Sequence, residues 1–253
     1  MKKKIGKISI VAFLLSFCIN FYLLLGNHEE EISIQQLFLS ATFDMKTILS
    51  HQSFILTMEN MVGVVVFSLF FGMVLYQDFF GPGIYVLLRV ENRANWFRTR
   101  MKELLVSAFF FSMSYFASIL ILCCLNAKTV PNMEIIELFL LMSLAYTMLM
   151  YQMIIVINFV AVKTQIAVGF FSGYLGLILL VQLCLKFEQI PVIGSYHWLS
   201  FWNPVNALSV YLVDSVGIKL AIMIYYLGLC ILETEYVVRK LAKTDVSLGM
   251  EEV

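Results

Sequence analysis

Charged residues are scarce in this chain. Lys, Arg, Asp and Glu together make up 13% of the sequence, whereas hydrophobic residues make up 61%. A typical soluble domain is about 25% charged and roughly 45–50% apolar. The scarcity excludes a water-soluble fold, because such a fold could not hide this much apolar surface. The formal net charge is zero, so the charge balance gives no reason to expect a nucleic-acid partner.

Catalytic and metal-binding motifs are also missing. No GxxxxGK followed by Ser or Thr occurs, so the chain lacks the phosphate-cradling loop that ATP hydrolysis needs. The three histidines are scattered through predicted loops, and the five cysteines lie inside apolar runs without metal-ligand spacing. Glu29, Glu30 and Glu31 lie in a loop with no Arg following, which argues against a diacidic intramembrane protease. We therefore expect no catalytic residue, bound metal, cofactor or enzyme activity in this chain alone.

The chain contains six long apolar runs. A spanning helix needs about 20 predominantly apolar residues, and lipid offers no partner for backbone polar groups, so the spans must be helical. The first run could instead be a cleaved signal peptide, but no small-x-small cleavage site follows it. The pattern predicts a single all-α polytopic membrane domain over residues 1–253. Its six transmembrane helices are expected at about 8–25, 54–76, 104–125, 138–162, 166–185 and 218–237.

Lys and Arg fall almost wholly into alternate gaps between the runs. Short, positively charged loops stay in the cytoplasm, so the larger set of basic residues marks the cytoplasmic side and both termini are predicted to lie there. The opposite side carries only Lys46, Lys128, Lys186 and Lys219. The cytoplasmic set is Lys2, Lys3, Lys4, Lys7, Arg89, Arg93, Arg98, Arg100, Lys102, Lys163, Arg239, Lys240 and Lys243.

The segment after the first run predicts an amphipathic helix, because its apolar residues recur at helical spacing. Such a helix could lie on the outer membrane surface or could cap the bundle, and the cap is favoured. The apolar positions are Ile34, Leu37, Phe38, Ala41, Met45, Ile48 and Leu49.

The longest predicted cytoplasmic connection joins the second and third runs. It begins by breaking the second span at residues 77–83, which include Gly81-Pro82-Gly83. Apolar and basic residues then alternate, and Arg89 and Arg93 share one helical face at i and i+4. Arg and aromatic residues are enriched at protein interfaces, so this segment is predicted to dock on a partner. The alternative is a positively charged anchor without a partner.

The last loop, residues 190–208, is too apolar for a solvated loop and too interrupted for a full span. We interpret it as a pair of short helices that dip back toward the membrane from outside. Its Trp side chains would lie at headgroup depth, and neighbouring spans would shield its broken backbone. The residues expected to shape this re-entrant hairpin are Pro191, Trp198, Trp202, Asn203 and Pro204.

Polar groups inside spans are functional hypotheses by default. Glu59, with its neighbour Asn60, lies near the outer end of the second run, and its carboxylate is the least favourable of these groups in an apolar span. It could line a pathway for a cationic peptide, or it could reach the outer surface or pair with a neighbour. Amides within spans more often act as interhelical glue. These amides are Asn20, Gln152, Asn158 and Gln182.

The six spans, the basic segment before the third and the Pro-containing hairpin before the sixth together resemble the permease subunit of an ABC-2-type transporter. The stretch from Tyr85 to Trp96 is similar to small Gram-positive permeases associated with bacteriocin and lantibiotic export or self-immunity. The Glu-rich start of many coupling segments is reduced here to Asp78. The resemblance implies a re-entrant pair at about 190–213 and a coupling helix at about 79–96. This helix would dock on an ATPase through Phe79, Phe80, Tyr85, Leu88, Arg89, Arg93 and Trp96.

The resemblance also implies a function and partners. A separate ATPase subunit would bind ATP and Mg²⁺ and supply the energy, and a second copy or a homologous permease would complete the pathway. The expected cargo is a bacteriocin-like or lantibiotic-like peptide, or another amphipathic molecule, moved across a bacterial cell membrane. Membrane lipid is the remaining expected partner. The alternative from another class is a non-transporting membrane anchor or sensor subunit.

Overall fold

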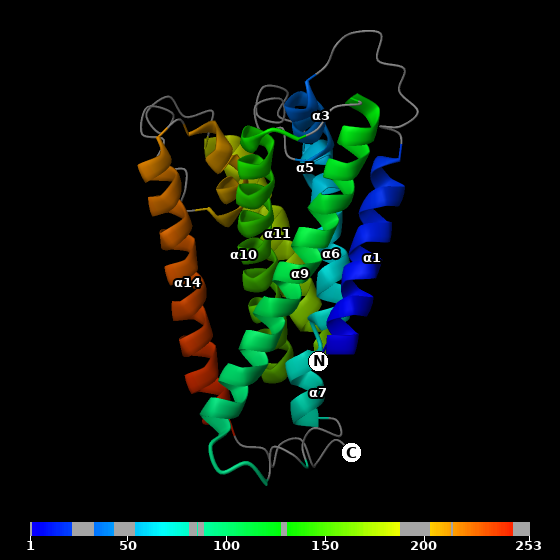
Figure 1. The fold of residues 1–253 in the computed structure, drawn as a ribbon. Coiled ribbons are helices and arrows are strands. Elements are labelled where there is room, and N and C mark those ends of the chain that lie inside the picture. The colour runs from blue at the N-terminus through cyan, green and yellow to red at the C-terminus, as the bar shows by residue number, and fades with distance from the viewer. Residues whose placement is uncertain are drawn as a thin grey trace.

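The computed structural model is a bundle of long helices (Figure 1). It describes residues 2–21, 33–42, 54–80, 85, 89–127, 131–187, 203–213 and 215–244. The elements within these ranges are helices, with no strand among them, which confirms the predicted all-α class. They are α1 (Lys2–Asn20), α3 (Ile34–Ala41), α5 (Phe54–Asn60), α6 (Val62–Phe71), α7 (Val74–Phe80), α9 (Arg93–Ala127), α10 (Met133–Lys163), α11 (Ile166–Phe187), the 3-10 helix η1 (Pro204–Leu212) and α14 (Val216–Ala242).

Five helical stretches in the described ranges are long and apolar enough to cross a membrane. Three are α9, α10 and α14, and the others are Val62–Phe80, which combines α6 and α7, and Ile166–Lys186 in α11. The first predicted span corresponds to α1, whose apolar part Gly6–Asn20 is shorter. These five helices are compatible with a multi-pass membrane protein, and the sixth span stays a prediction.

The central helix is α10. It packs against α6, α7, α9, α11, η1 and α14, and 78% of its most apolar stretch is buried, compared with 22% for α11 and for α14. Asn132 caps its start, where the side-chain oxygen accepts from the Ile135 N–H at 3.0 Å and satisfies one of the free backbone donors. Because α11 and α14 keep most of their apolar surface outward, they suit contact with lipid.

The second predicted span differs from the continuous helix expected over residues 54–76. It is divided into α5, α6 and α7, with gaps at Met61 and at Gly72–Met73. Each gap interrupts the ladder in which the C=O of one residue accepts from the N–H four residues later. Polar side chains of α10 fill both gaps.

Tyr146 bridges the first gap. Its buried hydroxyl accepts from the Val64 N–H at 3.1 Å and donates to the Asn60 C=O at 3.1 Å. In a continuous helix, these two backbone groups would bond to each other. A Cβ atom at Gly63 would lie 2.6 Å from the same hydroxyl, so the glycine allows Tyr146 to reach the backbone.

Asn158, one of the predicted glue amides, bridges the second gap in the same way. Its Oδ1 accepts from the Leu75 N–H at 2.8 Å, and its Nδ2 donates to the Phe71 C=O at 2.9 Å and to the Ile154 C=O at 3.0 Å. A side chain inserted into the helical ladder is a known cause of helix kinks. The role of Asn158 as interhelical glue is confirmed.

The close approach of α10 and α11 depends on glycine. A Cβ atom at Gly169 would lie 2.7 Å from both the Ala161 Cβ and the Ile157 carbonyl oxygen. One turn later, a Cβ at Gly173 would overlap the Ile157 side chain. Small residues four apart commonly let membrane helices approach closely.

We therefore expect Gly169→Ala to destabilise the chain by about 1–3 kcal/mol, because the added methyl group would force the two helices apart. Gly176→Ala is the matched control, since nothing lies within 4 Å of a Cβ at that position. The unfolding free energy in mild detergent measures both. Equal stability of the two variants would show that the α10–α11 contact tolerates separation.

The predicted amphipathic helix is present as α3, and it caps the bundle. Leu37, Phe38 and Ala41 are buried, and the Phe38 ring lies 6.3 Å from the Phe116 ring of α9. The capping interpretation is therefore confirmed for residues 34–41, and Met45, Ile48 and Leu49 lie outside the described ranges. We call this the capped end of the bundle.

At the opposite end, α1 begins, α7 ends, α9 begins and α14 ends (Figure 1). We call it the basic end, because the described residues there include Arg93, Arg98, Arg100, Arg239 and Lys240. The start of the first helix and the end of the last therefore lie on one side of the bundle.

Candidate functional site

The candidate site lies at the basic end, around the junction of α7, α9 and α14. Of the residues predicted to dock on a partner, Tyr85 is 70% exposed and Arg89 is also exposed. Arg93 is the first residue of α9 and is half-buried. Leu88 lies outside the described residues. Tyr85 and Arg89 are therefore available at the surface.

The aromatic residues predicted for the same segment pack inward instead. Phe79 is 3% exposed and stacks on Phe97 of α9, with 5.3 Å between ring centroids. Phe80 is half-buried and packs on Tyr76 at 4.5 Å, and Trp96 meets Phe97 edge to face at 5.0 Å. The Phe79–Phe97 stack holds the end of α7 against the start of α9, while the other two ring pairs each lie within one helix.

An ion pair reinforces this junction. Asp78 of α7 is buried, and its Oδ2 lies 3.2 Å from the Arg100 Nε, while the Arg100 Nη2 donates to its Oδ1 at 3.4 Å. The Arg100 Nη1 also donates to Glu103 at 2.9 Å, and the guanidinium lies over the Trp96 ring at 5.0 Å. Arg100 therefore connects α7 to the first turns of α9 through charge and packing together.

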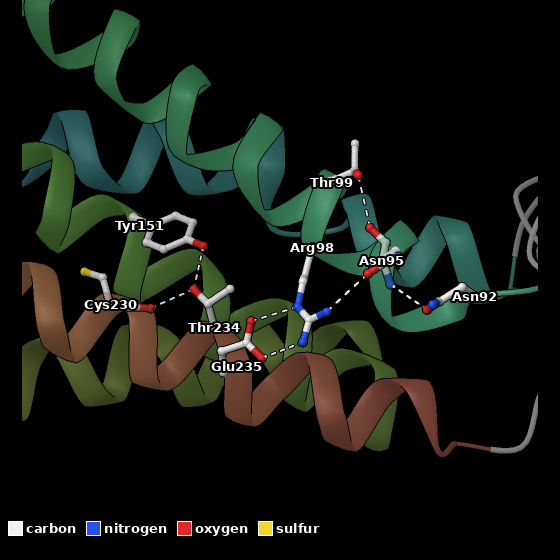
Figure 2. A network of polar contacts seen from close by, with 8 residues as sticks. All are labelled: Asn92, Asn95, Arg98, Thr99, Tyr151, Cys230, Thr234 and Glu235. Carbon is white, nitrogen blue, oxygen red and sulfur yellow. Dashed lines mark hydrogen bonds and ion pairs between the residues drawn. The ribbon is translucent and has the colours of Figure 1, made fainter.

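A second ion pair connects α9 to α14 (Figure 2). The Arg98 Nε donates to the Glu235 Oε1 at 2.8 Å, and its Nη2 donates to the Oε2 at 2.9 Å. This two-pronged geometry is the strongest form of an Arg–carboxylate contact. Next to it, the hydroxyls of Tyr151 and Thr234 lie 2.7 Å apart and link α10 to α14. Three helices thus meet in one polar network.

The cap of α9 belongs to the same network. The Asn95 N–H donates to the Asn92 Oδ1 at 3.0 Å, which satisfies a free donor at the helix start. The Arg98 Nη1 then donates to the Asn95 Oδ1 at 3.2 Å. The residues that begin α9 and the residue that binds α14 are therefore connected side chain to side chain (Figure 2).

A double-mutant cycle should measure the coupling between Arg98 and Glu235. Their side chains are 42% and 34% exposed, so solvent screens the pair and we expect only about 0.5–1 kcal/mol of coupling. Arg98→Ala and Glu235→Ala should each lower the unfolding free energy, and the double variant should lose less than the sum. Strict additivity would mean that the pair contributes nothing to stability.

The predicted pathway residues lie in α5. Glu59 belongs to this helix, but its side chain lies outside the described part of the structure. Asn60 is half-buried, and its backbone carbonyl accepts the hydroxyl proton of Tyr146. Asn60 therefore lies at the first gap in the span, where its C=O group has a partner from α10.

Two of the predicted hairpin residues are described, and both lie at the start of η1. Asn203 is 1% exposed and caps η1, with its Oδ1 accepting from the Val205 N–H at 3.0 Å. Its Nδ2 donates to the Leu180 C=O at 2.7 Å, and its C=O accepts from the Tyr226 hydroxyl at 2.8 Å. Pro204 occupies the first turn of η1. Pro191, Trp198 and Trp202 lie outside the described residues.

These contacts place Asn203 well below the capped ends of its neighbours. Leu180 lies seven residues before the end of α11, roughly 10 Å along the helix axis. Tyr226 lies ten residues after the start of α14, roughly 15 Å along its axis. The start of η1 therefore lies inside the bundle.

Glu233 and Glu235 were missed by the sequence analysis, although both lie within the predicted last span. The signal was present, because two carboxylates within Leu232-Glu233-Thr234-Glu235 are unusual in a stretch that continues an apolar run. Glu235 pairs with Arg98. Glu233 contributes to a different site that is described below.

The described residues contain no group of three or more His, Cys, Asp or Glu side chains that could hold a metal ion. The cysteines in these ranges are free thiols. Comparison with family models, with curated proteins and with solved structures found no match.

Proposed function

We propose that this chain is the membrane-spanning permease subunit of an ATP-driven ABC transporter of the ABC-2 type. A separate ATPase subunit supplies the energy, and a second copy or a homologous permease completes the pathway. The cargo is a bacteriocin-like or lantibiotic-like peptide or another amphipathic molecule. In this proposal the basic end faces the cytoplasm of a bacterial cell, and Tyr85 and Arg89 contact the ATPase.

The observation that carries the proposal is the pairing around the start of α9. The exposed residues Tyr85 and Arg89 immediately precede this helix. Within its first two turns, Arg98 binds α14 and Arg100 binds α7. A displacement of the docking segment would therefore be transmitted through α9 to both α7 and α14. A subunit that converts motion of an ATPase into motion of a bundle needs such a connection.

The capped end supports the same proposal from the other side. Asn203 fixes the start of η1 to α11 and α14 inside the bundle. In this proposal η1 is the second arm of a re-entrant hairpin that seals the outer mouth of the pathway, since a non-spanning segment is tolerated at membrane depth where it is buried in protein. Glu59 and Asn60, in the helix before the first gap, are the proposed pathway residues.

Purification of the affinity-tagged chain from membranes of its own host tests the proposal. In mild detergent we expect a second chain that contains the GxxxxGK motif to co-purify and to hydrolyse ATP. The absence of any such chain, with the tagged protein intact and folded, would favour a non-transporting anchor or sensor subunit. A tagged Tyr85 variant separates docking from folding. It removes a proposed docking residue and leaves the Asp78–Arg100 ion pair of the fold unchanged.

A further inference from the structure

A cavity of about 140 Å³ lies between α10, α11 and α14. By the same measure one water molecule needs only ~10–15 Å³, so the cavity can take a substantial chemical group. Its walls are mainly apolar, and Gly176 leaves part of the space open because nothing lies within 4 Å of a Cβ there. Three polar side chains also line it: Ser172, whose hydroxyl donates to the Gly169 C=O at 2.9 Å, Gln152 and Glu233.

Gln152 and Glu233 carry buried polar atoms without a hydrogen-bond partner in the described structure. Gln152 is only 7% exposed, yet neither its Oε1 nor its Nε2 makes a hydrogen bond. The Oε2 of Glu233 is buried and also has none. Buried polar groups are nearly always bonded, and each exception calls for an explanation such as a bound group. The three unsatisfied atoms belong to two residues that line one cavity, which points to a missing occupant.

The depth of the cavity limits what that occupant can be. Gln152 and Glu233 lie eleven and nine residues before the ends of α10 and α14 at the basic end, or about 15 Å along each axis. Val156 lines the cavity and is itself 43% exposed, so the cavity reaches the outer face of the bundle. An occupant would therefore come from the lipid phase and needs an apolar body.

The polar atoms of the cavity determine which head group the occupant must carry. A carboxylate at membrane depth needs a cation or a proton, and no Lys or Arg is found among the described residues that line this cavity. A primary ammonium group offers three donors, enough for the Glu233 Oε2 and the Gln152 Oε1. A carboxylate has about four lone-pair sites, so it can also accept from the Gln152 amide.

We infer that the Gln152–Glu233 cavity is a lipid-accessible binding site for the ammonium end of an amphipathic cation. The head group binds between the carboxylate and the amide, and the apolar tail leaves past Val156 toward the lipid. This site does not depend on the proposed partnership with an ATPase, and it would serve an anchor subunit equally well.

Dodecylamine is the probe for the test, and dodecanol is its neutral counterpart. A ligand that binds only the folded state raises the unfolding temperature in proportion to its affinity. We expect dodecylamine, but not dodecanol, to raise the unfolding temperature of the full chain in non-ionic detergent. Glu233→Gln should weaken the apparent affinity for dodecylamine by roughly tenfold or more, because a charged hydrogen bond is lost.

Gly176→Leu provides a second variant that leaves the carboxylate in place and fills the cavity. It should abolish the dodecylamine effect even where Glu233→Gln fails to fold. Gly228→Leu is its matched control, because a Cβ at Gly228 also meets nothing within 4 Å and this glycine does not line the cavity. An equal response to dodecanol, no response of the wild type, or an unchanged response in both cavity variants would overturn the inference.

Discussion

Replacing Tyr85 and Arg89 together by alanine is expected to release the proposed ATPase subunit from the chain in mild detergent. Both side chains are exposed. Tyr and Arg are the residue types that most often dominate interface energy, at roughly 2 kcal/mol or more for each anchor. When two such losses add, the affinity falls by roughly a thousandfold.

The structure offers a matched control at the same end of the bundle. Tyr236 and Arg239 of α14 are also an exposed Tyr–Arg pair, but they lie outside the docking segment. Tyr236→Ala/Arg239→Ala should therefore keep the ATPase. The measurement is the ratio of ATPase to permease after affinity purification, together with ATP hydrolysis. A Tyr85/Arg89 double variant that retains its ATPase at the wild-type ratio would show that docking occurs elsewhere.

Substitutions of the buried residues beside the docking segment should act in a different way from substitutions of Tyr85 and Arg89. Phe79 and Asp78 lie inside the bundle, against Phe97 and Arg100. Changes at these positions would disturb the seating of α9 on α7 and would act on coupling through the fold. The sequence pattern placed Phe79 and Tyr85 in one docking element, and the structure distinguishes a buried anchor from an exposed one.

The long helices were predictable because their cause is local. A run of about 20 apolar residues is sufficient to indicate a membrane helix, and α10, α11 and α14 follow the predicted runs closely. The extent of α9 was not predictable from hydrophobicity, since its first turns contain Arg93, Arg98 and Arg100. These turns are stabilised by an Asn92 cap and by side chains from α7 and α14.

The gaps in the second span were not predictable either, because they too depend on side chains from another helix. Nothing in the apolar run around Met61 marks a helix break, because the break depends on the Tyr146 hydroxyl from a helix more than 80 positions away in the chain. The unpaired state of Gln152 and Glu233 is likewise a property of packing. Sequence can identify Gln152 as a polar residue in a span, but whether it meets a partner is decided by α11 and α14.

Asn158→Leu is expected to destabilise the chain by about 2–6 kcal/mol, because it removes the partner of two backbone groups at once. Leucine has a similar volume but cannot accept from the Leu75 N–H or donate to the Phe71 C=O, which Asn158 now does. A buried donor or acceptor left unsatisfied costs about 1–3 kcal/mol. This loss could be recovered only if the Leu75 N–H donated directly to the Phe71 C=O, which would straighten the junction of α6 and α7.

Packing at Gly72 opposes that straightening. The Gly72 N–H already donates to the Ser68 C=O at 2.6 Å, and Phe170 of α11 lies where a Cβ at Gly72 would be 2.8 Å away. The bend is therefore held from α11 as well as from α10, so the freed backbone groups should stay unpaired. Asn20→Leu is the matched control, since Asn20 is also buried but bonds only to the Ser16 carbonyl of its own helix. The unfolding free energy in detergent compares the two. A loss at position 158 no larger than that at position 20 would mean that α6 and α7 keep their bend without Asn158.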